Sequence, residues 1–72
     1  MKEEFIINCG VQHLSGIYRN LSKTEKLNFL ENLFEIFKKI KFNGFKYQII
    51  TFAKRNNLVD FMNICIGELE KC

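Results

Sequence analysis

The chain has 72 residues, of which 47% are hydrophobic and 14% aromatic, and its 11 basic and 8 acidic side chains give a net charge of +3. This length limits it to a single domain, which we take as residues 1–72. The apolar content excludes a disordered chain, and no apolar run approaches the ~20 residues that a membrane span requires.

Residues 3–20 are predicted to form the first helix, because apolar side chains recur there at helical spacing and acidic residues stand in the first turn. Gly10 falls on the apolar face, where the missing side chain would let a neighbouring helix approach closely. The alternative is a short strand over residues 4–8, since Ile6 and Ile7 are β-branched.

Residues 23–42 have the clearest helical pattern. Ser22 and Glu25 have the spacing of a capping box, and Asn43-Gly44 is typical of a helix stop. The apolar residues fill about half of the circumference, so we expect a central helix that contacts two neighbours, or one neighbour and a second copy of the chain. These apolar residues are Leu27, Phe29, Leu30, Leu33, Phe34, Ile36, Phe37 and Ile40.

Two more helices are predicted over residues 45–56 and 58–71, and a strand over residues 47–52 is the alternative for the first of them. In the last helix Ile64 lies apart from the main apolar stripe, so we expect its side chain to be exposed. Joints of two or three residues favour antiparallel neighbours. The predicted fold class is all-α, a compact bundle of about four short helices.

Few residues are candidates for chemistry. Cys9 and His13 are four residues apart and could share a zinc ion, but Cys65 and Cys72 lie ~10.5 Å apart along one predicted helix and cannot both reach it. A nucleophilic Cys–His pair would need a deprotonated thiol and an orienting third group, for which the sequence offers no candidate. There is no phosphate-binding loop, dinucleotide-binding glycine pattern or nucleophile elbow. We therefore predict a non-enzymatic protein without catalytic, metal or cofactor sites.

The acidic side chains of the second predicted helix are interpreted as solvated surface. Glu31 and Glu35 share its exposed side, where nothing apolar surrounds them to make the two carboxyl groups unequal. Glu35 is expected to pair with Lys39 one turn later.

Positive charge is concentrated between residues 36 and 59, where six basic residues occur without an acidic one. This basic block fits an acidic protein face, nucleic-acid phosphates or plain solvated surface. For nucleic acid, the helix over residues 45–56 would present Gln48 and Thr51 beside its last basic residues. The candidate partner-binding residues are Lys38, Lys39, Lys41, Lys46, Tyr47, Thr51, Lys54, Arg55 and Ile64.

Residues 49–65 combine an apolar pair, an aromatic residue, a basic cluster, a tight joint and a second apolar stripe, carried by Ile49, Ile50, Phe52, Arg55, Leu58, Phe61 and Met62. This segment resembles the last two helices of bacterial death-like, effector-associated adaptor modules. The joint is one residue shorter than in that family, and Asn stands where Gly is usual. The resemblance covers about a quarter of the chain and implies homotypic protein–protein contact without catalysis.

We expect a small protein-interaction module, an adaptor or inhibitor that binds a larger protein. Lys, Asn, Ile and Phe supply 34 of the 72 residues, a bias of A/T-rich genes that fits a low-GC bacterium, a phage or a mobile element. A homodimer is also expected, because a domain of this size buries only ~60% of the surface of its unfolded chain. The alternative is a DNA- or RNA-binding regulator that uses the basic block.

The cellular compartment is inferred from the cysteines and from the start of the sequence. Three cysteines without tight spacing do not form a disulfide framework, and we see no basic segment followed by a long apolar stretch. The expected location is therefore the cytoplasm.

Overall fold

The computed structural model describes residues 3–71. This part of the chain holds five helices and no strand: α1 (Glu3–Asn8), α2 (Val11–Arg19), α3 (Lys23–Lys39), α4 (Asn43–Arg55) and α5 (Val59–Glu70). The all-α bundle predicted from the sequence is confirmed. The alternative strands over residues 4–8 and 47–52 are wrong, because both segments are helical. None of the helices in residues 3–71 has the length and apolarity needed to cross a bilayer.

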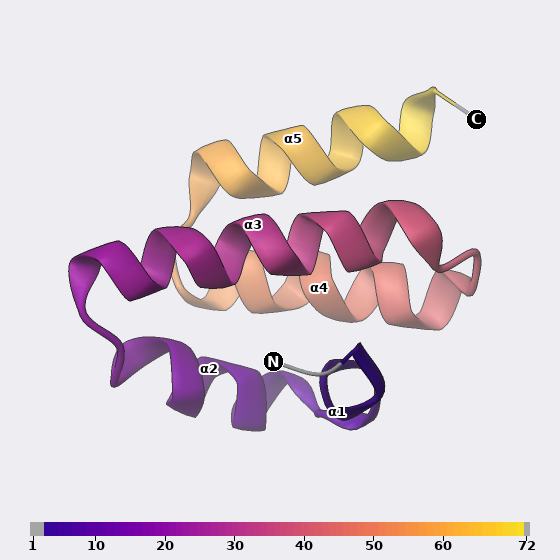
Figure 1. Cartoon of the computed structure of the whole chain (residues 1–72). Coiled ribbons are helices and arrows are strands. Elements are labelled where there is room, and N and C mark those ends of the chain that lie inside the picture. Colours follow the sequence, from indigo (N-terminus) through magenta and orange to yellow (C-terminus); the bar gives the residue numbers. More distant parts are fainter. Residues whose placement is uncertain (1–2, 72) are drawn as a thin grey trace.

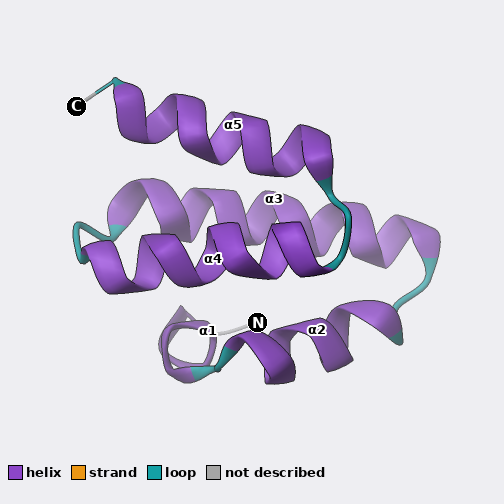
Figure 2. Cartoon of the chain, turned by 180° about the vertical axis from the view of Figure 1, so that it is seen from behind, coloured by secondary structure: helices purple, strands orange, loops and turns teal. Residues whose placement is uncertain are grey.

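The helices are arranged around the α3–α4 pair, with α5 on one side and α2 on the other (Figure 1). In this view α3 and α5 run in one direction, and α2 and α4 run in the other. The same order is seen from behind in Figure 2, and α1 is viewed end-on in both pictures, so it crosses the remaining helices. Helices α3 and α5 are therefore parallel neighbours.

The first predicted helix is interrupted at Cys9 and Gly10. Gly10 has an extended backbone (φ −75°, ψ 167°) and is the N-cap of α2 rather than a residue inside a helix. An added Cβ would find open space there, so Gly10 does not serve the close helix packing that we expected. The break leaves the Cys9 carbonyl without a helical partner, and the Gln48 side-chain amide of α4 donates a 2.7 Å hydrogen bond to it.

Helix α3 begins as predicted. The Glu25 backbone N–H donates to the Ser22 hydroxyl at 3.3 Å, and the Ser22 backbone N–H donates to the Glu25 carboxylate at 2.9 Å, which together make a capping box. These hydrogen bonds, the one from the Ser22 backbone above all, lower the pKa of the Glu25 carboxyl. The reciprocal bonds satisfy two backbone donors at the start of the longest helix.

The end of α3 differs from the prediction. The helix ends at Lys39, Ile40 is extended, and Asn43-Gly44 forms the first turn of α4 instead of stopping α3. A Cβ on Gly44 would lie only 2.8 Å from the Phe42 ring. A side chain at position 44 would therefore collide with the Phe42 ring, which explains why glycine fits this position.

The joint between α4 and α5 is a Schellman motif. The Leu58 N–H donates to the Ala53 carbonyl at 2.9 Å and the Asn57 N–H donates to the Lys54 carbonyl at 3.2 Å. Asn57 has φ 57°, in the left-handed region that asparagine tolerates better than most residues. The tight turn lets α5 fold back across α4.

Helix α4 contributes most to the core. Its buried residues are Phe45, Lys46, Ile49, Phe52 and Ala53, and it contacts α2, α3 and α5. The Phe52 ring meets the Tyr18 ring edge-on, with centroids 5.6 Å apart, and lies 6.1 Å from the Phe29 ring. Phe52 thereby joins α2, α3 and α4 in one aromatic cluster.

Candidate functional site

An open groove of about 460 Å³ lies between the parallel helices α3 and α5. Its lining is almost entirely apolar and includes one charged residue, and we call it the α3–α5 groove. Leu27 is 60% exposed and Ile64 is 55% exposed, so large aliphatic side chains on both walls face solvent. The lining residues are Leu27, Leu30, Glu31, Phe34, Phe61 and Ile64.

The groove exists because the apolar arc of α3 is wider than the surface that its neighbours cover. One part of the arc is buried in the core through Phe29, Leu33, Ile36 and Phe37. The adjoining part is turned toward α5, which packs against it only partly and leaves Leu27 exposed. A complete core and an uncovered apolar surface thus coexist on one helix.

Sequence reasoning found one side of this groove and missed the other. The expectation that Ile64 is exposed is confirmed. Leu27 and Phe34 were expected in the apolar face of a central helix, but Leu27 is exposed and Phe34 is half-buried. The half-apolar circumference of α3 was the available signal, because it predicted either two neighbouring helices or one neighbour and a second copy of the chain. Helix α3 contacts α2, α4 and α5.

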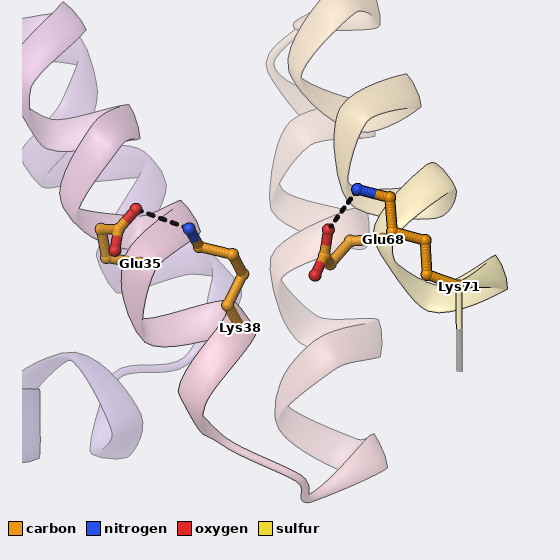
Figure 3. Close-up of polar contacts among 4 residues, drawn as sticks. All are labelled: Glu35, Lys38, Glu68 and Lys71. Atoms are coloured by element: carbon orange, nitrogen blue, oxygen red, sulfur yellow. Dashed lines mark ion pairs between the residues drawn. The ribbon is translucent and has the colours of Figure 1, made fainter.

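Two ion pairs lie toward the C-terminal ends of the groove-forming helices (Figure 3). Lys38 pairs with Glu35 at 2.9 Å on α3, and Lys71 pairs with Glu68 at 3.5 Å next to the end of α5. Each pair therefore stays within one segment instead of linking α3 to α5. The Lys38 ammonium also stands 5.1 Å from the centroid of the Phe34 ring.

The predicted pairing of Glu35 with Lys39 is replaced by another arrangement. Glu35 pairs with Lys38, and Lys39 reaches Glu3 of α1 at 3.5 Å. Two basic residues of the predicted block are thus engaged by carboxylates of the same chain. These pairs are well exposed and contribute little to stability.

The remaining basic residues do not form one patch. Lys41 lies in the α3–α4 connection, whereas Lys54 and Arg55 lie at the far end of α4, a helix ~19 Å long. Lys46 was expected to be available to a partner, but it is only 7% exposed. The packing of α4 against α3 places its ammonium over the Phe37 ring, 4.9 Å from the centroid.

The polar residues of α4 that we expected to meet a partner are mainly used inside the chain. The Gln48 amide binds the Cys9 carbonyl, and the Thr51 hydroxyl donates to the Tyr47 carbonyl at 2.9 Å. Tyr47 is 64% exposed and is the one uncommitted side chain of the three. Of the expected recognition helix, Lys54 and Arg55 stay exposed, whereas the polar groups of Gln48 and Thr51 are hydrogen-bonded within the chain.

Cys9 and His13 are brought together, as their spacing suggested. The Cys9 sulfur lies 3.8 Å from Nδ1 of His13, at the edge of a depression of about 390 Å³ that Glu4, Phe5 and Asn8 also line. Burial raises the pKa of the Cys9 thiol, which disfavours the nucleophilic thiolate. The Asn8 amide donates to the Glu4 carbonyl, so it does not orient the imidazole.

The residues that the sequence analysis considered as zinc ligands are Cys9, His13, Cys65 and Cys72. Among residues 3–71 no group of three or more His, Cys, Asp or Glu side chains is placed to hold a metal ion. Cys65 is buried in the core on α5, and Cys72 lies outside the described residues.

Comparison of the chain with models of protein families, with curated proteins and with solved structures finds no match. The resemblance of residues 49–65 to death-like adaptor modules stays a prediction. In the structure that segment is the α4–α5 hairpin, in which Ile49, Phe52 and Phe61 are buried.

Proposed function

We propose that this protein is a non-enzymatic protein-interaction module, an adaptor or inhibitor that docks on a larger protein through the α3–α5 groove. The observation that supports this most is the presence of exposed Leu27 and Ile64 on facing walls of one apolar groove. Contiguous apolar surface of this kind is typical of contact sites for other protein chains. The core does not need these side chains, because its largest members are fully buried without them.

The shape of the groove fits an α-helical segment of the partner. The lining residues Leu27 and Phe34 are seven positions apart on α3, which is about two helical turns or ~10.5 Å. A partner helix with apolar anchors spaced over two turns would fill such a groove. A cytoplasmic location is part of the proposal, and the free thiols of Cys9 and Cys65 support it.

Site-directed photo-crosslinking in the native host tests the proposed function. A photoreactive residue at position 64 should capture a chain of different mass, and one at the exposed position 5 on α1 should not. The captured protein, once purified, should bind the wild-type chain and lose affinity at least about tenfold for Ile64→Lys, which places a charge in the apolar groove. Equal crosslinking from both positions, or unchanged affinity of Ile64→Lys, would contradict the proposal.

A further inference from the structure

We infer that in the free protein a second copy of the chain covers the α3–α5 groove. The two copies lie antiparallel, related by a two-fold axis that crosses the helices near Phe34 and Ile64. This inference rests on the proposed function in one respect, the use of the α3–α5 groove as a docking surface. The inference goes beyond the proposed function by naming a second copy of the chain as what occupies the groove when no larger partner is bound.

The first argument is the order of charges along α3. Glu31, Phe34 and Lys38 are spaced by three and four residues, so they follow one another on a single face over ~10.5 Å. Glu31 lines the groove, and it takes part in none of the ion pairs among residues 3–71. The face therefore reads acid, aromatic and base from the start of the helix toward its end.

The same order recurs along α5. Asp60 is exposed in its first turn, Ile64 follows at the middle, and Lys71, whose side chain is 76% exposed just after the helix end, pairs with Glu68. Asp60 borders the groove region, because it lines an adjoining depression together with Leu30. Since α3 and α5 run in the same direction, Glu31 and Asp60 both precede the lysines along the face, and Lys38 and Lys71 lie there together with their paired carboxylates Glu35 and Glu68 (Figures 1 and 3).

Such a face is complementary to itself only when the second copy is reversed. The antiparallel arrangement brings Glu31 opposite Lys38 of the second copy and sets the Phe34 and Ile64 side chains near the two-fold axis. A parallel arrangement would bring acid against acid and base against base, which opposes association. The ammonium groups of Lys38 and Lys71 carry three donors each, so their intramolecular ion pairs leave donors for a second carboxylate.

The size of the groove predicts a moderate affinity. Six residues line it, whereas a standard stable interface uses about 20–30 residues on each side. We therefore expect a dissociation constant in the micromolar range, so that a tighter partner displaces the second copy. Covering exposed Leu27 and Ile64 supplies the apolar part of that affinity.

Sedimentation equilibrium from about 1 μM to about 1 mM tests the dimer. The wild-type mass should rise from 8.6 kDa toward twice that value with increasing concentration. Ile64→Lys should weaken dimerisation at least about tenfold. Phe5→Lys is the matched control, because Phe5 is 46% exposed on α1 and does not line the α3–α5 groove, so this change should leave the dissociation constant unchanged.

Charge exchange tests the antiparallel register. Glu31→Lys and Lys38→Glu should each weaken self-association, because every copy would then set like charges at both contacts. An equimolar mixture of the two variants should dimerise about as well as the wild type, because lysines then meet glutamates at both contacts. Circular dichroism should show the same helix content for all variants, so that a loss of dimer is not a loss of fold.

Each result decides a separate point. A monomer at every concentration, or a dimer that Ile64→Lys does not weaken, would overturn the inference. Loss of dimer with Ile64→Lys but undiminished self-association of Glu31→Lys and Lys38→Glu would overturn the antiparallel register, because a parallel pair already sets like charges together in the wild type. The proposed function fails by a different measurement, namely crosslinking at position 64 that captures no chain of another mass.

Discussion

Lysine side chains lie over aromatic rings in several places on this small protein. The ammonium group of Lys26 stands 5.2 Å from the centroid of Tyr18, that of Lys38 5.1 Å from Phe34, and that of Lys46 4.9 Å from Phe37. Each arrangement lets an aliphatic stem cover apolar surface while the charge faces the ring. Counting charges along the sequence therefore overstates the free positive surface, as Lys46 shows.

Truncation of two phenylalanines on α3 should separate the core from the groove. Phe37 is fully buried, so Phe37→Ala should lower the free energy of unfolding by about 3–5 kcal/mol through a core cavity. Phe34 is half-buried at the groove, and Phe34→Ala should cost clearly less. Denaturant melts of both variants, followed by circular dichroism, provide the comparison. Equal costs would mean that Phe34 belongs to the core.

The thiol of Cys65 predicts a loss of stability in alkaline solution. Burial, with a smaller effect of the Glu68 charge, raises its pKa from the ordinary 9.0 to about 11. The unfolded chain therefore releases this proton first, so the stabilisation is complete below about pH 9 and is lost as the pH rises toward about 11. In melts with a reductant, the stability difference between the wild type and Cys65→Ala should shrink over that range. A constant difference would contradict the prediction.

At the scale of the elements, the sequence predicts those features of a helix that depend on hydrogen bonds between residues close in the chain. The Ser22–Glu25 capping box forms as expected, because its hydrogen bonds need only the first turn of α3. The break at Gly10 could not be predicted from helical spacing, since the Cys9 carbonyl is satisfied by Gln48, 39 positions away. Asn43-Gly44 fits the end of one helix and the first turn of the next equally well. In the structure the pair begins α4, and the Phe42 ring occupies the space next to Gly44.

The α4–α5 joint offers a direct test of the Schellman motif. Asn57 holds a left-handed backbone, where a β-branched side chain costs about 1–2 kcal/mol and glycine costs nothing. Asn57→Gly should preserve or raise the free energy of unfolding, and Asn57→Val should lower it by about that amount. Thermal melts of the pair measure the difference. A stable Asn57→Val variant would show that the joint has another conformation.

For the whole molecule, the α3–α5 groove depends on how helices distant in sequence meet. Ile64 could be recognised as exposed from its own helix, because it stands apart from the apolar stripe of α5. The exposure of Leu27 could not be recognised from the sequence, because α3 is apolar over half its circumference. The position of α5 decides which part of this apolar surface is covered. The predicted basic block is separated into two parts in a similar way, because the length of α4 lies between Lys41 and the Lys54–Arg55 pair.

That division leads to an expectation for nucleic-acid binding. The charges of Lys38 and Lys39 are partly offset by paired carboxylates, Lys46 is buried, and a helix length separates Lys41 from the Lys54–Arg55 pair. Few phosphates can be contacted at once, and each contact adds only about −0.9 to the slope of log affinity against log salt on B-DNA. We expect binding to generic duplex DNA weaker than about 1 μM at about 0.15 M salt, with a shallow slope.

Fluorescence polarisation with duplex DNA and single-stranded RNA measures this at several salt concentrations. The Lys54→Glu/Arg55→Glu double variant should leave the proposed dimer and the proposed capture of a protein partner unchanged, because neither residue lines the α3–α5 groove. Submicromolar binding of nucleic acid that this double variant abolishes would instead favour the DNA- or RNA-binding regulator. In that case the exposed end of α4 would be the binding surface, since electrostatic affinity follows the cations that remain free.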